Sequence, residues 1–158
     1  MELDLKAHLK GMAERMKGLL IKDIRAIPAD KHAACPGGCA KSPLYMIAEC
    51  ATVNLLAANY LATGEQPTRP SPDERDALLR AYTDTEKTLA FLEESVVKYR
   101  EAVDGFDATR FGERNDAFFG RPMTNFGIAE LAGVHMMYHD GQLNTIQMLL
   151  GDNENHWG

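Results

Sequence analysis

The sequence has 158 residues, of which 45% are hydrophobic and 25% are charged, and this length suits a single domain, 1–158, with one core. The formal net charge of −6 argues against nucleic-acid binding, which depends on clustered lysine and arginine. No apolar run reaches the roughly 18 residues of a membrane span, and the charged start MELDLKAHLK is unlike a signal peptide. We therefore expect a cytoplasmic protein with no membrane or nucleic-acid partner, whose three cysteines are reduced.

The first two predicted helices have clear apolar faces and clear ends. The first runs from about Leu3 to Ala26, and Pro28 ends it. Its apolar residues recur at three- and four-residue steps: Leu5, Leu9, Met12, Met16, Leu19, Leu20, Ile24 and Ile27. The second begins with Ser42 as N-cap and ends at Gly64. Its apolar face is Leu44, Ile47, Ala48, Ala51, Leu55, Ala58 and Ala62.

Two further helices are predicted in the second half of the chain. The third starts at the capping-box sequence SPDE, with Ser71 as N-cap, and continues to Gly105. Its apolar face is Leu78, Ala81, Tyr82, Leu89, Leu92, Val96, Tyr99 and Val103. A loop rich in glycine, arginine and phenylalanine then leads to a fourth helix, which Thr124 or Asn125 caps and Gly151 ends. No alternation of apolar and polar residues indicates a strand, so the sequence predicts an all-α four-helix bundle.

Polar groups interrupt the fourth predicted helix in the stretch GVHMMYHDGQLNTIQMLLGD. One predicted stripe contains Ile128, Leu131, His135, Tyr138, Gln142, Ile146 and Leu149, and His139 lies at its flank. We therefore expect His135, His139 and Gln142 to face the interior. Histidines four residues apart lie about 6 Å apart along a helix axis, which suits two ligands of one divalent ion. A hydrogen-bonded pair of core histidines is the structural alternative.

Glu49, in the stretch SPLYMIAECATVN, is the predicted third ligand. It lies about two turns into the second helix, beside the apolar face, and has no lysine or arginine three or four residues away. An inward glutamate and two inward histidines would satisfy one another around a metal ion. Cys50 is the neighbouring alternative, but successive helical residues point about 100° apart, so Cys50 is expected to face elsewhere.

These stretches resemble the DinB and YfiT-like superfamily of four-helix-bundle metalloproteins. The resemblance runs from IRAIPAD, at the end of the first helix, through SPLYMIAECATVN to HMMYHDGQLNTIQMLLGD, which is its most specific part. The last helix of that superfamily typically has two histidines at HxxxH spacing followed by a Gly–Gln pair, as in the letters HDGQ here. The resemblance implies His135 and His139 as metal ligands, with Glu49 where the superfamily usually has a third histidine.

The resemblance also implies a class of chemistry. Two histidines and one carboxylate suit Zn²⁺, Ni²⁺ or Fe²⁺, and three protein ligands leave one coordination position open, as in catalytic zinc sites. Relatives in the superfamily include enzymes that use low-molecular-weight thiols such as bacillithiol or mycothiol. We expect a small-molecule transferase or hydrolase with a metal-activated thiol or water. Gln142, Tyr138 and Tyr45 are its candidate substrate-binding residues.

Other features leave alternatives open. The alternative to an enzyme is a non-catalytic, stress-related helical-bundle dimer or binding module, in which the polar groups form only a buried hydrogen-bond network. In CPGGC, Cys35 and Cys39 are read as partly buried loop thiols, although His32 nearby would also suit a small metal loop. The loop RFGERNDAFFGRP is read as a packed loop, or as a segment that gates the pocket or holds an acidic ligand; its residues of interest are Arg110, Arg114, Arg121, Phe111, Phe118 and Phe119. The apolar content, with eight methionines, suits a homodimer.

Overall fold

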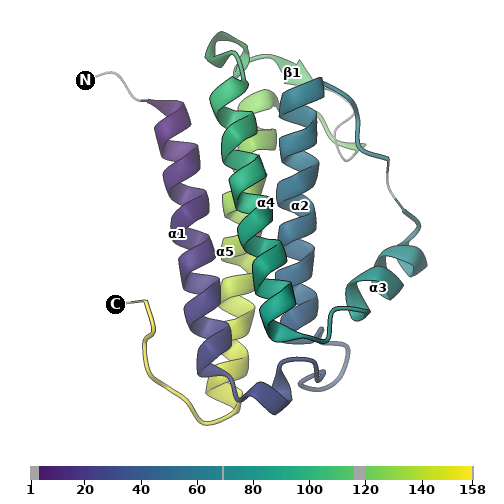
Figure 1. The fold of residues 1–158 in the computed structure, drawn as a ribbon, viewed down its shortest axis with the longest axis vertical. Coiled ribbons are helices and arrows are strands. Elements are labelled where there is room, and N and C mark those ends of the chain that lie inside the picture. Colours follow the sequence, from purple (N-terminus) through teal and green to yellow (C-terminus); the bar gives the residue numbers. More distant parts are fainter. Residues whose placement is uncertain (1–3, 69, 116–119, 158) are drawn as a thin grey trace.

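Four long helices form a bundle in the described part of the chain, and a short helix stands beside it (Figure 1). The computed structural model describes residues 4–68, 70–115 and 120–157. The bundle helices are α1 (Leu5–Ala26), α2 (Pro43–Thr63), α4 (Thr85–Gly105) and α5 (Asn125–Leu149). The outer helix is α3 (Pro72–Arg80), and short 3-10 turns span Ala29–Lys31 and Ala108–Arg110. In the bundle, α1 and α2 each pack against both α4 and α5. The prediction of an all-α four-helix bundle is confirmed.

The ends of α2 and α5 follow the predicted capping residues. The Ser42 hydroxyl accepts a hydrogen bond from the Tyr45 amide, and Gly64 ends α2 in the left-handed conformation, at φ 74°. At the start of α5, the Thr124 hydroxyl accepts a hydrogen bond from the Gly127 amide. Each N-cap satisfies an amide that the helix itself leaves unpaired, so these boundaries have a local origin.

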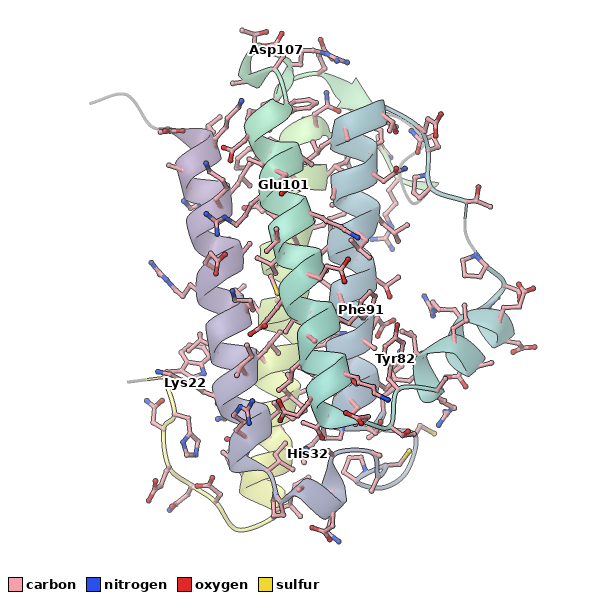
Figure 2. The ribbon with its side chains drawn as sticks, in the orientation of Figure 1. Lys22, His32, Tyr82, Phe91, Glu101 and Asp107 are labelled. Carbon is pink, nitrogen blue, oxygen red and sulfur yellow. The ribbon has the colours of Figure 1, made fainter. Side chains whose placement is uncertain are left out.

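The prediction of one continuous third helix over Ser71–Gly105 is wrong, because the chain breaks between α3 and α4. The Asp84 carboxylate accepts a hydrogen bond from the Lys87 amide at 3.0 Å and caps α4. Aspartate and threonine bond to nearby backbone more readily outside a helix than inside one, which favours a new start at this point. At the break, the rings of Tyr82 and Phe91 stack with their centroids 5.3 Å apart (Figure 2).

One side chain anchors α3 to the bundle. Leu79 is the buried residue of α3 and is only 2% exposed. It packs in a small apolar cluster with Tyr45 and Ala48 of α2, and Tyr82 lies against the same cluster. The helix α3 is therefore held against α2 by a small contact that is separate from the core of the bundle.

A pair of short strands corrects the expectation that the chain forms none. Residues Arg114–Asn115 (β1) pair antiparallel with Met123–Thr124 (β2). Two-residue strands are too short to produce a detectable alternation of apolar and polar residues. The predicted loop residues Phe118 and Phe119 lie outside the described part of the chain.

The helix α2 is more apolar than the sequence analysis recognised. By length and composition, Pro43–Thr63 is suited to crossing a membrane, but 67% of its most apolar 18-residue window is buried inside the bundle. Its apolar residues face α4 and α5, which is what the central helix of a bundle requires.

Two carboxyl groups are buried together between α1 and α5. Asp23 and Asp140 are both fully buried, and their carboxyl oxygens have no hydrogen-bond donor among the described residues. Burial, together with the neighbouring Asp23 carboxyl, raises the pKa of Asp140 well above its usual range. The Asp140 carboxyl therefore retains a proton in a large fraction of molecules at neutral pH.

We expect Asp23→Asn to increase the free energy of unfolding at about pH 8 and to change it little near pH 4. Because the pKa of Asp140 is raised in the folded protein, the folded state binds more protons than the unfolded state. Its contribution to stability is complete below the unfolded pKa, near 4, and is lost as the pH rises through the folded pKa. Denaturant unfolding at both pH values checks this. An equal effect of the substitution at the two pH values contradicts the raised pKa of Asp140.

Candidate metal centre

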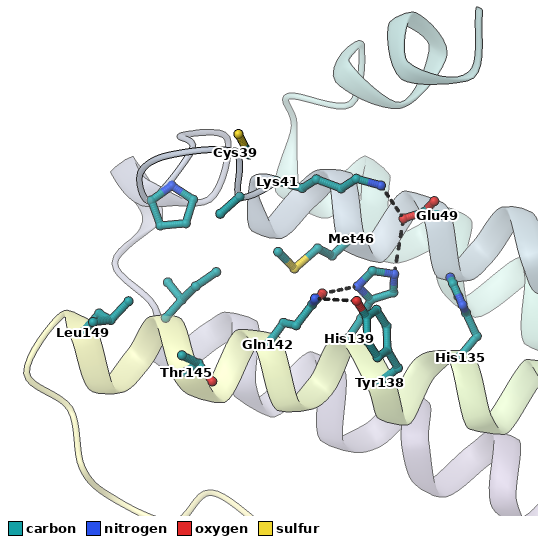
Figure 3. Close-up of a pocket in the computed structure, with 13 residues that line it drawn as sticks. Cys39, Lys41, Met46, Glu49, His135, Tyr138, His139, Gln142, Thr145 and Leu149 are labelled. Atoms are coloured by element: carbon teal, nitrogen blue, oxygen red, sulfur yellow. Dashed lines mark hydrogen bonds and ion pairs between the residues drawn. The ribbon is translucent and has the colours of Figure 1, made fainter. Parts of the chain in front are cut away.

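The three residues predicted as metal ligands meet where α2 faces α5 (Figure 3). Glu49 projects from the first half of α2, and His135 and His139 project from successive turns of α5. The centroids of the two imidazole rings are 4.7 Å apart, and the ring planes make an angle of 83°. All three side chains line one cavity, whose volume is about 570 Å³.

Hydrogen bonds along α5 fix the protonation of His139. The side chain is only 2% exposed, and its Nδ1 lies 2.7 Å from Oε1 of Gln142. The Gln142 amide nitrogen in turn donates to the Tyr138 hydroxyl at 3.0 Å. Because an amide oxygen only accepts, Nδ1 of His139 is the protonated nitrogen. In the neutral imidazole, Nε2 then presents a lone pair toward α2, as a metal ligand must.

The Glu49 carboxylate lies directly opposite that lone pair. Oε2 of Glu49 is 3.3 Å from Nε2 of His139, but the contact lacks the geometry of a hydrogen bond. Two ligands of one tetrahedral zinc ion are about 3.3 Å apart when each bond is about 2.0–2.1 Å long. The separation of these two atoms therefore fits a shared metal ion.

Lys41 is a partner of Glu49 that the sequence analysis missed. Its Nζ lies 3.1 Å from Oε2 of Glu49. Burial alone raises the pKa of Glu49, but contact with His139 and Lys41 outweighs burial and lowers this pKa to about 2. Lys41 precedes the helix and is eight residues from Glu49, beyond the helical neighbours that a sequence pattern compares. Glu49 is therefore ionised at neutral pH.

His135 is neutral at neutral pH and has an unused nitrogen. It is half-buried, and its Nε2 has no hydrogen-bond partner among the described residues. Burial lowers the pKa of His135 to about 4, and the neighbouring His139, Lys41 and Arg75 act in the same direction, against the opposing charge of Glu49. A neutral imidazole with a free nitrogen is the form that binds a metal.

Cys50 lies closer to the histidines than its predicted orientation implies. Donor atoms of Cys50, His135 and His139 all lie within 4.8 Å of one another, and this group does not include Glu49. Cys50 does point away from Glu49, as expected, because α2 presents Glu49 to the cavity and Cys50 to the core. It nevertheless comes close to the histidines, because α2 packs closely on α5. Burial, followed by the charges of Glu49 and Asp140, raises the pKa of Cys50 well above its ordinary value. Without a metal, Cys50 is a neutral thiol.

The expectation that the polar stripe of α5 faces the interior is correct only in part. Tyr138 is 60% exposed and Leu149 is 75% exposed, whereas His135 and Gln142 are half-buried. Ile128 and Ile146 of the stripe are buried in the core as predicted, and the other buried residues of this face include Ala132, Met136, His139, Asp140, Leu143 and Gln147. The polar part of the stripe, His135, Tyr138 and Gln142, lines the cavity, where it can reach a ligand.

The structure separates the two candidate tyrosines. Tyr138 lines the cavity beside Gln142. Tyr45 is 2% exposed and packs against Leu79 beneath α3, and it is not among the residues that line the cavity of the metal centre. The Lys41 ammonium lies over the Tyr45 ring, 4.2 Å from its centroid. Tyr45 thus positions α3 and Lys41.

The loop cysteines are exposed, and not partly buried as predicted. Cys39 lies at the edge of the cavity that contains the histidines. His32 is not available for a metal loop, because both ring nitrogens already have partners. Its Nδ1 is 2.9 Å from the Thr85 hydroxyl, and its Nε2 is 2.8 Å from the Ile27 carbonyl oxygen.

We expect the double variant Cys35→Ser and Cys39→Ser to keep the fold and the metal content of the parent. Both thiols are exposed and lie outside the group of donor atoms at Cys50, His135 and His139. Circular dichroism and elemental mass spectrometry check the two properties. Loss of metal from the double variant would move the metal site to the loop.

No protein-family model matches the sequence, and no curated protein sequence matches it. Solved structures do match the fold. A conserved protein from Enterococcus faecalis aligns with a TM-score of 0.73 at 12% identity, over 96% of this chain and 100% of that one. Two structures of mycothiol-dependent maleylpyruvate isomerase, one of a mutant, align with TM-scores of 0.70 and 0.69 at 14% identity. They cover 89% of this chain, which spans 61% of the isomerase chain. The protein therefore has the DinB/YfiT-like four-helix-bundle fold.

Proposed function

We propose that the protein is a metal-dependent enzyme that acts on a small molecule, with Glu49, His135 and His139 as ligands of a zinc, nickel or iron ion. One observation carries the proposal. The Nε2 atoms of both histidines are buried without a hydrogen-bond partner in the described part of the chain, at the cavity that Glu49 lines. Leaving a buried polar atom unpaired costs about 1–3 kcal/mol. Two such atoms at one place favour a shared ligand.

The chemistry proposed for this site is nucleophilic attack on a small electrophile. A bound divalent metal lowers the pKa of a thiol or a water and so supplies an anionic nucleophile. Gln142 holds His139 in the tautomer that a ligand needs. Tyr138 accepts a hydrogen bond from Gln142, which leaves its own proton free to bond a substrate oxygen on which negative charge develops.

A low-molecular-weight thiol is the co-substrate that we propose, which makes the protein a transferase. The mycothiol dependence of the isomerase with the same fold supports this choice. The cavity of about 570 Å³ is within the range of about 300–1,000 Å³ that is typical of small-molecule sites. Hydrolysis, with water in place of the thiol, is the related reaction.

The hydrogen bonds at the site favour this function over a non-catalytic polar network. A network that fixes the register of helices must join side chains on different helices. The bonds from His139 to Gln142 and from Gln142 to Tyr138 both lie within α5. Neither bond therefore holds α5 in register with another helix. The contact between Glu49 and His139 does join α2 to α5, but it lacks the geometry of a hydrogen bond.

Metal content tests the proposal directly. Elemental mass spectrometry of the untagged protein, purified without added metal, should find close to one divalent ion per chain. A chain that contains no metal, and that also fails to bind zinc or nickel after refolding with either ion, contradicts the proposed function.

We also expect the protein to form a homodimer. The outer surface of α5 exposes several large apolar side chains: Val134, Met137, Tyr138, Met148 and Leu149. An exposed apolar stripe along one helix is typical of a contact between subunits. Size-exclusion chromatography with light scattering should give twice the chain mass of 17.5 kDa, and Met137→Glu should reduce it to the monomer. A parent protein that elutes as a monomer contradicts the expectation.

A further inference from the structure

A second cavity adjoins the candidate metal centre on its other side. Its volume is about 700 Å³, and it shares Glu49 and His135 with the first cavity. Its walls are mostly apolar and come from α2, α3, β2 and α5. The apolar residues include Val53, Leu56, Leu79, Met123 and Leu131. A molecule in this cavity would touch two of the three residues proposed as metal ligands, Glu49 and His135.

The break between α3 and α4 places an arginine in this cavity. Leu79 anchors α3 to α2, and Arg75 lies four residues earlier, so it projects from the same face of the helix. Both residues line the cavity. A third helix continuous through the break would not leave α3 beside α2 in this way (Figure 1).

A second arginine reaches the same cavity from a different part of the chain. Arg121 precedes β2 and lines the cavity with Arg75. Both side chains are exposed, and among the described residues neither has an ion pair or a side-chain hydrogen bond. The net charge of the chain is −6, but the guanidinium groups of Arg75 and Arg121 have no carboxylate partner among the described residues. They therefore make the entrance of this apolar cavity positively charged. Glu49, the acidic residue of this lining, is already paired with Lys41.

We propose that this second cavity binds an amphipathic organic acid, with its carboxylate or phosphate held by Arg75 and Arg121 and its apolar body against α2, α3 and α5. Guanidinium groups bind both kinds of anion through paired hydrogen bonds. The end of the molecule remote from the acid then lies at Glu49 and His135. The role of this cavity in catalysis rests on the proposed function. In that reaction, the electrophilic substrate would bind in the second cavity and the thiol in the first.

The test compares three eight-carbon probes on the metal-free protein, so that no probe can bind through a metal. Octanoate and octyl phosphate have an acidic end, and octanol has the same chain without charge. Chemical shifts in ¹H–¹⁵N spectra report both the affinity and the place of binding. We expect at least one of the acids to bind about tenfold or more tightly than octanol, with shifts at Leu79, Met123 and Leu131, which line the second cavity only.

Variants test whether the two arginines cause the preference for acids over octanol. The double variant Arg75→Gln and Arg121→Gln should lose about tenfold or more of its affinity for the acid and keep its affinity for octanol. Arg15→Gln is the matched control, because Arg15 is exposed on α1 and lines neither of these cavities. The inference is overturned if the acids and octanol bind equally well, or if the double variant keeps full affinity for the acid. It is also overturned if the chemical-shift changes are confined to Thr145 and Leu149 of the first cavity. None of these results depends on metal content, which tests the proposed function separately.

Discussion

His135→Ala, His139→Ala and Glu49→Ala should each leave the protein with only traces of metal after dialysis. Each change reduces three protein ligands to two, which is fewer than the sites of catalytic zinc have. Glu49→His should restore metal binding, because imidazole is also a good ligand for zinc, nickel and iron. Elemental mass spectrometry of the dialysed variants measures the effect, and circular dichroism verifies that each variant is folded.

Gln142→Ala is the matched control on the same helix. Gln142 contacts Nδ1 of His139 and does not belong to the proposed ligands. All three proposed ligands remain in this variant, so it should keep most of its metal. Its activity should fall, because loss of a residue that orients a ligand costs about 10–100-fold in metal affinity or activity. If all three ligand variants instead retain the metal content of the parent, the assignment is wrong.

Cys50→Ala distinguishes the two candidate ligand sets. With Glu49 as the third ligand, Cys50→Ala keeps its metal, and the cobalt-substituted parent shows no thiolate-to-cobalt charge-transfer band in the near ultraviolet. The raised pKa of Cys50 supports this expectation, since burial and two nearby carboxyl groups oppose formation of the thiolate. A charge-transfer band that disappears in Cys50→Ala, while Glu49→Ala retains metal, assigns the position to Cys50.

Leu79→Ala should release α3 from α2 without unfolding the bundle. Replacing a buried leucine by alanine costs about 2–5 kcal/mol, and Leu79 is the buried anchor of α3 in its small cluster with Tyr45 and Ala48. Hydrogen exchange should therefore accelerate in the amides of α3, while the bundle helices keep their protection. The midpoint of thermal unfolding should change little.

Leu92→Ala provides the comparison in the core. Leu92 is fully buried in the cluster between the bundle helices, so the same substitution there should lower the free energy of global unfolding by about 2–5 kcal/mol. Denaturant unfolding measures it. If Leu79→Ala destabilises the whole protein as much as Leu92→Ala, then α3 folds as part of the bundle and not as a separate unit.

The sequence by itself determined the features that depend on neighbouring residues. Caps such as Ser42 and Thr124 satisfy amides only three residues away, and apolar spacing within each helix predicts the bundle. His135 and His139 were predicted to act together for the same reason, because residues one helical turn apart project side by side. The break at Asp84 was missed although its signal is local, since the apolar spacing continues through it.

Only the tertiary structure decided which groups from different helices meet. The rotation of α5 in the bundle turns His139 and Asp140 inward and leaves Tyr138 exposed. The approach of α2 to α5 brings Cys50 to the histidines, and the position of α3 brings Arg75 to the second cavity. Helical periodicity specifies which residues share a face, but the partner of that face depends on how all the helices pack around the common core.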